Sequence, residues 1–134
     1  MCFSAYLVGS FERRFGVGSS FQIINPTTED LEVVVAFFDD QEKYQTCLKN
    51  RLTPNDMWEI VVPVHVKDLK PQFGVVKIIS YRDKTPKEGL VGYQRHVLVT
   101  PKATEVAFSE TVLAAVPTGF AGPELAKLLE LCKM

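Results

Sequence analysis

The sequence predicts an all-β protein, an antiparallel β-sandwich of seven or eight strands with one short C-terminal helix. Three observations predict this fold class. Apolar and polar residues alternate with a period of two along most of the chain. Turn-forming residues separate these segments at intervals of about 8–15 residues. No long amphipathic helix lies between the strands, which argues against a parallel α/β sheet.

The strands follow one another with clear turn signals between them. We expect strands over residues 4–11, 20–25, 31–40, 44–49, 57–62, 73–82 and 90–100. Asn25-Pro26, residues 52–56 and Pro63 end three of them. Residues 64–71 form a polar connector, and residues 107–116 are compatible with either a strand or a helix. This order suits an Ig-like or jelly-roll-like sandwich, with residues 1–134 as a single domain.

A C-terminal helix is predicted over about residues 123–133. Pro123 suits its first turn, and Glu124 lies near the positive end of its dipole. One apolar stripe recurs at helical spacing, formed by Leu125, Leu128, Leu129 and Cys132. A helix of about 11 residues is marginal alone, so this stripe packs either on its own sandwich or on a neighbouring subunit. These four residues are the candidate oligomer contact.

Length and composition exclude several classes of protein. A chain of 134 residues can bury a single core, and 46% apolar with 23% charged residues argues against disorder. The net charge of −1 gives no reason to expect nucleic acid as a partner. No apolar run reaches the roughly 18 residues needed to span a bilayer, and no basic segment precedes the first apolar stretch. We therefore expect a cytoplasmic protein without membrane insertion.

Three cysteines, Cys2, Cys47 and Cys132, are too few and too scattered to predict a disulfide framework or a metal site. Cys2 and Cys132 lie near the two ends of the sequence, where either could be a reducible surface thiol. Alternatively, Cys47 and Cys132 are small hydrophobic residues inside the fold.

Residues 90–99, LVGYQRHVLV, place a tyrosine, an arginine and a histidine within four positions. In a strand, Tyr93 and Arg95 share one face, while His96 points to the other. The three therefore do not form a reaction centre. The Tyr93–Arg95 pair either binds an anion or carboxylate or pairs with an acidic neighbour across the sheet. Together with Tyr81 it is the candidate ligand or partner surface.

No metal or cofactor site is predicted. His65 and His96 have no partner at metal-ligand spacing. The Gly-Val-Gly of residues 16–18 follows two arginines, but a phosphate cradle needs a helix after the glycines. A strand follows here, so a flexible hairpin loop is expected instead.

Catalytic residues are not apparent either. The acidic pairs at residues 29–30 and 39–40 lie in predicted turns, where Asp stabilises the turn through backbone hydrogen bonds. Ser109 has no histidine nearby and no nucleophile-elbow setting. We therefore expect no enzymatic activity.

Charge is distributed unevenly along the chain. Residues 25–60 carry eight acids against three bases, and residues 63–102 carry eight bases against three acids. If the two segments interleave in the sandwich, their charges cancel, and this is the expected outcome. If they segregate, they provide complementary surfaces for self-association or a basic patch for a charged partner.

The order of these elements resembles the sensory-rhodopsin-transducer-like family of small soluble β-sandwich proteins. The similarity spans residues 20–116 and includes Asn25-Pro26, the V-x-V-x-F of residues 33–37, the V-G-Y-Q-R-H of residues 91–96 and the T-V-L-A-A-V of residues 111–116. The resemblance implies a homo-oligomer, a dimer or tetramer, that binds partners in signalling and has no enzymatic role. The leucine-striped helix departs from the pattern, and no functional residue is transferred.

Two functions follow as hypotheses. The first is a non-enzymatic protein-interaction or signalling adaptor that acts as a homo-oligomer. The second is a small-ligand or carbohydrate-binding sandwich in which Trp58, Tyr81, Tyr93 and Arg95 supply stacking and hydrogen bonds. Alternation places Trp58 with Ile60 and Val62 on an apolar face, so we expect Trp58 to be buried, which counts against the second hypothesis.

Overall fold

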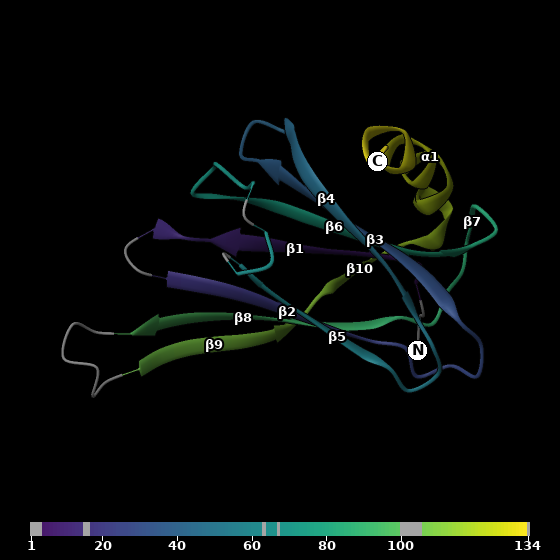
Figure 1. Ribbon diagram of the computed structural model, residues 1–134, viewed down its shortest axis with the longest axis horizontal. Helices are drawn as coiled ribbons and strands as arrows, with labels where there is room; N and C mark the ends of the chain where they lie inside the picture. Colours follow the sequence, from purple (N-terminus) through teal and green to yellow (C-terminus); the bar gives the residue numbers. More distant parts are fainter. Residues whose placement is uncertain (1–3, 15–16, 63, 67, 100–105, 134) are drawn as a thin grey trace.

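A computed structural model of the chain describes residues 4–14, 17–62, 64–66, 68–99 and 106–133. The described residues form two antiparallel sheets, A and B, that pack against each other, with one α-helix on the outer side of sheet A (Figure 1). The prediction of an all-β sandwich with a short C-terminal helix is confirmed.

Sheet A has the strand order β10-β1-β6-β3-β4, and β7 pairs with β6 beside this path. Its strands are β1 (Tyr6–Glu12), β3 (Leu31–Asp39), β4 (Tyr44–Leu52), β6 (Phe73–Arg82), β7 (Thr85–Pro86) and β10 (Ala114–Val116). Sheet B has the order β5-β2-β8-β9, made of β2 (Val17–Ile24), β5 (Met57–Val62), β8 (Val91–Val99) and β9 (Val106–Val112). The described residues thus form ten strands rather than seven or eight, because residues 107–116 divide into two strands and residues 85–86 add a short one.

The start of β2 differs from the prediction of a loop at residues 16–18 and a strand that begins at residue 20. The strand begins at Val17 and includes Gly18, so this segment continues directly into the sheet. A strand and not a helix follows the glycines, as expected, and the context of a phosphate cradle is absent here.

Strand β3 is apolar on both faces because it is covered on both. Its residues 33, 35 and 37 enter the core between the sheets, whereas residues 34, 36 and 38 pack beneath the helix. A strand buried on both faces has a continuous apolar run rather than an alternating pattern. This explains the sequence LEVVVAFF in β3, whereas edge strand β5, MWEIVV, alternates.

The core between the sheets contains three buried phenylalanines. Phe37 lies edge-to-face against Phe11 and Phe21, with ring centroids 5.9 and 6.3 Å apart. These rings come from strands of both sheets, so they hold the two layers together, and each buried ring contributes about 1.5–3 kcal/mol. Trp58 packs against this core but is only half-buried, because β5 lies at the edge of sheet B.

Residues 106–116 form strands and change from one sheet to the other. β9 belongs to sheet B and β10 to sheet A, and Leu113 between them is buried in the core. A Cβ atom at Gly92 would lie 2.5 Å from a methyl of Leu113 and 3.2 Å from Leu7. Glycine at position 92 therefore leaves room for the leucine that joins the two layers on this side of the sandwich.

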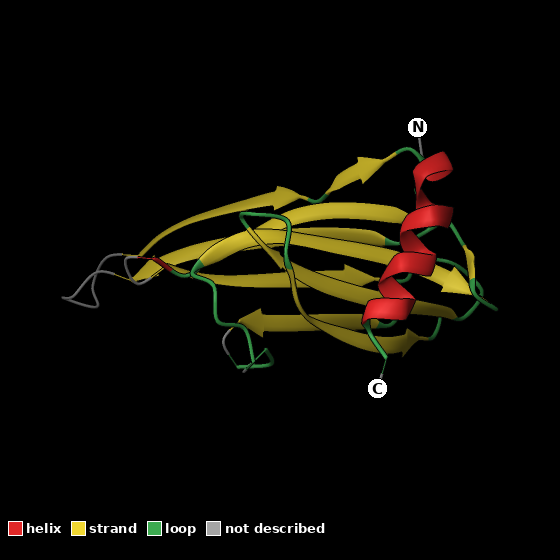
Figure 2. Cartoon of the chain, turned by 90° about the horizontal axis from the view of Figure 1, so that it is seen from above, coloured by secondary structure: helices red, strands yellow, loops and turns green. Residues whose placement is uncertain are grey.

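The helix α1 (Ala121–Leu131) follows a 3-10 turn, η2 (Thr118–Phe120), and runs across the strands of sheet A near one end of the sandwich (Figure 2). It begins and ends two residues before the predicted range, with Pro123 and Glu124 in its first turn as expected. Among the described residues, no helix has the length and apolar character needed to cross a membrane.

The apolar stripe of the helix packs on its own sheet. Leu125, Leu128 and Cys132 are buried and Leu129 is half-buried. They lie in a cluster with residues of sheet A that include Tyr6, Val34, Ala36, Ile79 and Tyr81. The candidate oligomer contact is therefore wrong for Leu125, Leu128 and Cys132, because their own chain already covers them, and Leu129 is left half-buried at the rim of this cluster. Of the two alternatives for the helix, the structure shows the one in which it caps its own sandwich.

Cys47 in β4 and Cys132 after the helix form a disulfide, with their Cα atoms 5.8 Å apart. The expectation that both cysteines lie inside the fold is confirmed, but the expectation that they are unpaired is wrong. The two residues are 85 positions apart in the chain. They meet only because the helix returns across sheet A to its edge strand, and cysteine spacing alone does not reveal this.

Candidate functional site

The outer face of sheet B carries no covering element among the described residues, in contrast to the outer face of sheet A (Figures 1 and 2). The strand registers place one set of side chains on this surface, which we call the open face. It consists of Gly18, Ser20, Gln22, Ile24, Met57, Glu59, Val61, Val91, Tyr93, Arg95, Val97, Glu110 and Val112. Each of these residues is half-buried or exposed.

The registers arrange the open face in rows that cross the strands. The first row is Met57, Ile24 and Val91, and the second is Glu59, Gln22, Tyr93 and Val112. The third row is Val61, Ser20, Arg95 and Glu110, followed by Gly18 and Val97. The polar groups therefore lie in the two middle rows, with apolar residues around them.

Two polar pairs cross the middle of the open face. Arg95 Nη2 donates to Glu110 Oε2 at 3.3 Å, and Gln22 Nε2 donates to Glu59 Oε2 at 3.0 Å. The Nε of Arg95 is buried and has no hydrogen-bond acceptor among the described residues. A guanidinium has five donors in a planar fork. The Arg95 side chain is 40% exposed, so a further carboxylate or carbonyl can reach the guanidinium through donors other than the buried Nε.

The apolar part of the open face includes two of the most exposed hydrophobic side chains in the described chain. Met57 is 55% exposed and Val112 is 66% exposed. Met57 lies in the same row as Ile24 and Val91, and Val112 lies beside Tyr93. Apolar side chains that gather on one face, with polar groups among them, are typical of a contact surface between proteins.

The structure separates Tyr93 and Arg95 from His96, as the strand alternation predicted. His96 points to the other side of β8, where its Nδ1 lies 3.0 Å from the hydroxyl oxygen of Ser19. That hydroxyl also accepts a hydrogen bond from the backbone N–H of Glu12 at 2.8 Å. Arg95 pairs with an acidic neighbour across the sheet, which was one of the two roles expected for it.

Tyr81 does not belong with Tyr93 and Arg95, so this part of the predicted surface is corrected. Tyr81 lies in β6 of sheet A, beneath the helix, whereas Tyr93 and Arg95 lie on the outer face of sheet B. Burial raises the pKa of the Tyr81 hydroxyl, and the nearby carboxylate of Glu32 raises it further. Since Trp58 packs against the inner core, the four residues proposed for a ligand site do not share one groove.

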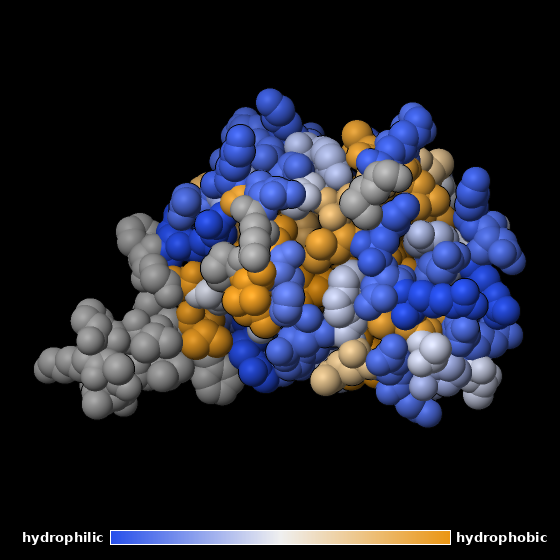
Figure 3. All heavy atoms as spheres, viewed as in Figure 1, coloured by the Kyte–Doolittle hydropathy of each residue, from blue (hydrophilic) through white to orange (hydrophobic). Residues whose placement is uncertain are grey.

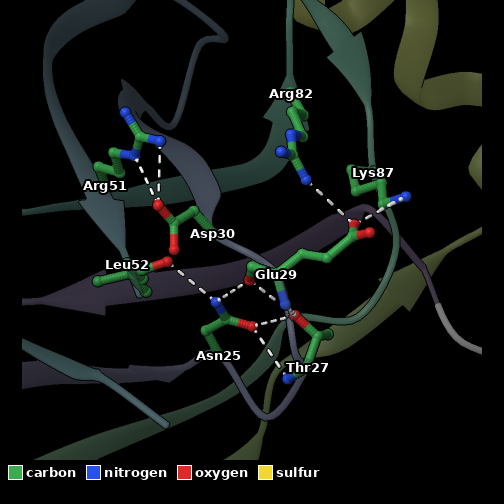
Figure 4. Close-up of polar contacts among 8 residues, drawn as sticks. All are labelled: Asn25, Thr27, Glu29, Asp30, Arg51, Leu52, Arg82 and Lys87. Carbon is green, nitrogen blue, oxygen red and sulfur yellow. Dashed lines mark hydrogen bonds and ion pairs between the residues drawn. The ribbon is translucent and has the colours of Figure 1, made fainter. Parts of the chain in front are cut away.

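Asn25 organises the turn that follows β2, and the predicted Asn-Pro turn is confirmed (Figure 4). Its Nδ2 donates to the carbonyl oxygens of Glu29 and Leu52 at 2.8 and 2.9 Å. Its Oδ1 accepts from the backbone N–H of Thr27 at 3.0 Å. Asn25 is fully buried, so these bonds stabilise the turn and are not available to a ligand.

Charges from the acidic and basic segments interleave beside this turn. The Glu29 carboxylate lies 3.3 Å from Arg82 and 3.2 Å from Lys87, and Asp30 lies 3.0 Å from Arg51 (Figure 4). The end of the sandwich at the β6–β7 turn is largely hydrophilic (Figure 3). The expected cancellation of the two charged segments is therefore confirmed for these residues, and Glu29-Asp30 belongs to a structural turn.

The other acidic pair and the two histidines also have structural partners. Asp39 Oδ1 accepts from the backbone N–H groups of Gln41 and Lys43, both at 2.8 Å. His65 Nδ1 accepts from the backbone N–H of Val61 at 2.8 Å. In the part of the chain that the structure describes, no group of three or more His, Cys, Asp or Glu side chains could hold a metal ion.

A groove of about 610 Å³ runs beside the helix. Its lining is Glu32, Lys49, Tyr81, Asp83, Lys84, Ala126, Leu129, Glu130 and Lys133. Charges of both signs lie along it, so it does not select an anion or a cation.

The open face is a sheet surface with Tyr93 near its middle, and we take it as the candidate functional site.

Sequence reasoning identified Tyr93 and Arg95 on this site but not the residues beside them. Gln22, Glu59 and Glu110 come from three other segments, and only the strand registers bring them together. The available signal was period-two alternation, which gives the residues that share a face within each strand but not which strands are neighbours.

Comparison with known proteins supports the fold. No protein-family model matches the sequence, and no curated protein matches it. The fold is similar to that of a solved protein. The crystal structure of Thermotoga maritima 1070 superposes with a TM-score of 0.64 and 13% sequence identity, and the match covers 88% of this chain and 99% of that one. At this identity the likeness concerns the fold alone.

Proposed function

We propose that this protein is a non-enzymatic interaction module that acts as a homo-oligomer and binds a second copy of itself through the open face. The observation that supports this proposal is the difference between the two outer faces. One is covered by a helix of the same chain, and the other exposes Met57 and Val112 beside polar groups. The resemblance over residues 20–116 favours the same role in a signalling assembly.

Two copies of the open face are suited to pack on each other. In a twofold dimer the same surface of each subunit forms the interface, and two sheets pack at about 10 Å with their strands roughly aligned. The face carries both charge signs, Arg95 with Glu59 and Glu110. A glutamate of the second copy can pair with the exposed part of the Arg95 guanidinium, while the apolar residues around the polar rows exclude water.

Light scattering coupled to gel filtration tests the proposal at low and high salt. We expect the wild-type protein to have the mass of a dimer or tetramer, and high salt to leave it assembled. Val112→Glu places a carboxylate in the apolar part of the open face and should shift assembly toward the monomer, with an affinity loss of about 100-fold or more.

Val64→Glu is the matched control for this experiment. Val64 is 59% exposed, close to Val112 in exposure, but it lies in the β5–β6 connection and not on a strand of sheet B. This variant should assemble like the wild-type protein. A monomeric wild-type protein at all concentrations, or equal effects of the two substitutions, would contradict the proposal.

A further inference from the structure

The C-terminal helix and the sheet face beneath it form a hydrophobic layer of their own. The described buried residues divide into two clusters that share no member. One fills the space between the two sheets, and the other joins the helix to the outer side of sheet A. Regions with separate packing can open locally while the rest of a domain stays folded. The helix layer therefore can open without disturbing the main core.

Two different contacts hold the two ends of the helix. Near its start, Lys77 Nζ donates to Glu124 Oε1 at 2.9 Å, and both side chains are largely buried. At its end, the disulfide joins Cys132 to Cys47 in β4. In the last turn, Leu128 is buried and Leu129 half-buried, whereas Leu131 is 38% exposed and the pair of Glu130 and Lys133 is exposed.

The disulfide is the covalent tie for the C-terminal half of the helix, beside the packing of Leu128. A helix of 11 residues is marginal when it is not held by packing or a crosslink. Beyond Leu128, Leu129 is half-buried in the cluster and Cys132 is the fully buried residue of the described chain. A disulfide across a separation of 85 residues strongly limits the freedom of the chain that it closes.

We propose that the Cys47–Cys132 disulfide is a redox latch, which holds the C-terminal half of α1 on sheet A when oxidised and releases it when reduced. Release widens the groove beside Tyr81 and uncovers the apolar residues of β3 that lie beneath the helix. The protein thereby gains a second uncovered sheet face, distinct from the open face of sheet B.

The reaction is thiol–disulfide exchange with a dithiol reductant. A thiolate of the reductant attacks Sγ of Cys47, forms a mixed disulfide and releases Cys132 as a thiolate. The second thiol of the reductant then displaces Cys47. One S–S bond breaks in the protein and one forms in the reductant, while two electrons and two protons pass to the cysteines.

The position of Cys47 favours attack at this sulfur. β4 is an edge strand of sheet A, and Cys47 is 9% exposed compared with 1% for Cys132. The state of the latch depends on the compartment, because thiols are kept reduced in the cytosol and disulfides persist in oxidising surroundings. A cytoplasmic location, as the sequence predicts, would keep the latch open, and an oxidising shift would close it.

Amide hydrogen exchange with and without dithiothreitol tests this proposal. The protein carries Cys2→Ser, so that no third thiol exchanges with the latch. On reduction, amides of residues 126–131 should exchange about tenfold faster or more, whereas amides of residues 19–23 in β2 should change less than about twofold. The variant that also carries Cys47→Ser and Cys132→Ser should show fast helix exchange without any reductant and no response to it.

Two results would overturn the proposal. Unchanged exchange of the helix amides on reduction would show that packing alone holds the helix. Equal acceleration in the helix and in β2 would show that the protein opens as one unit and has no separate latch. If the variant without cysteines does not fold, the oxidised and reduced forms of the Cys2→Ser protein still decide between these results.

Discussion

The two outer faces of the sandwich are built from similar strands, but the helix of the chain covers only the face of sheet A. On sheet A, Val34, Ala36 and Ile79 are inaccessible to solvent because α1 lies over them. On sheet B, Ile24, Val91 and Tyr93 lie on the two central strands, β2 and β8, and remain half-exposed. The helix thus covers one face, while no element among the described residues covers the other.

The ion pairs of the two faces also differ in their exposure to solvent. Lys77–Glu124 lies under the helix, with side chains 25% and 18% exposed, whereas Arg95–Glu110 on the open face is 40% and 39% exposed. Water screens the second pair more strongly than the first. An ion pair between a base and a glutamate is therefore expected to contribute to folding on sheet A and mainly to recognition on sheet B.

The largest expected difference concerns the leucines of the helix. Leu128→Ala removes a fully buried side chain from the layer on sheet A and should lower the free energy of unfolding by about 2–5 kcal/mol. Leu131→Ala, in the same helix but at an exposed position, should change it by less than about 0.5 kcal/mol. Urea unfolding followed by circular dichroism measures both. Equal losses of unfolding free energy in the two variants would mean that the helix does not pack on sheet A as described.

A smaller difference is expected between the two ion pairs. Glu124→Gln removes the charged partner of Lys77 in a largely buried setting and should lower the free energy of unfolding by about 1–3 kcal/mol. Glu110→Gln is the matched change on the open face and should have an effect of less than about 1 kcal/mol. A larger loss for Glu110→Gln in a verified monomer would contradict the contrast between the faces.

The smallest expected effect is a decline in stability at alkaline pH that arises on sheet A. Burial raises the pKa of Tyr6 above 10.0. Burial alone would lower the pKa of Lys77, but its hydrogen bond to Glu124 and its interactions with Tyr6 and the Glu124 charge together outweigh burial, so that its pKa lies above 10.5. Both groups hold their protons more tightly in the folded state. Their contribution to stability is therefore fully present below pH 10 and is lost as pH rises past these values.

Urea unfolding between pH 8 and pH 11 measures this decline. Because Glu124 raises the pKa of both Tyr6 and Lys77, Glu124→Gln should make the decline shallower. The Glu110→Gln variant on the open face should keep the wild-type slope. An identical slope in all three proteins would show that the groups beneath the helix do not cause the decline.

Much of the fold could be predicted from local sequence patterns. Alternation in β5 and β8 indicated strands and correctly separated His96 from Tyr93 and Arg95, since the period of two is a property of the extended backbone. The spacing of Leu125 and Leu128 indicated the helix and its buried face. The segment of residues 107–116 could not be assigned, because its two short strands belong to different sheets and are joined at Leu113.

The candidate site was predictable only in part. Tyr93 and Arg95 share a face because they are two residues apart in one strand. Glu110 and Gln22 join them because β9 and β2 are the neighbours of β8. Tyr81 could not be excluded from the sequence, because a strand pattern gives no information about the sheet to which the strand belongs.

Local sequence patterns were enough to predict most of the strands, most of the turns between them, and the apolar side of the helix. These properties depend on residues close in the chain, through backbone conformation and side-chain periodicity. The tertiary structure alone decided that the helix covers sheet A, that Cys47 meets Cys132, and that sheet B keeps an uncovered face. Each of these depends on contacts between distant segments, whose pairing follows from the packing of the whole chain.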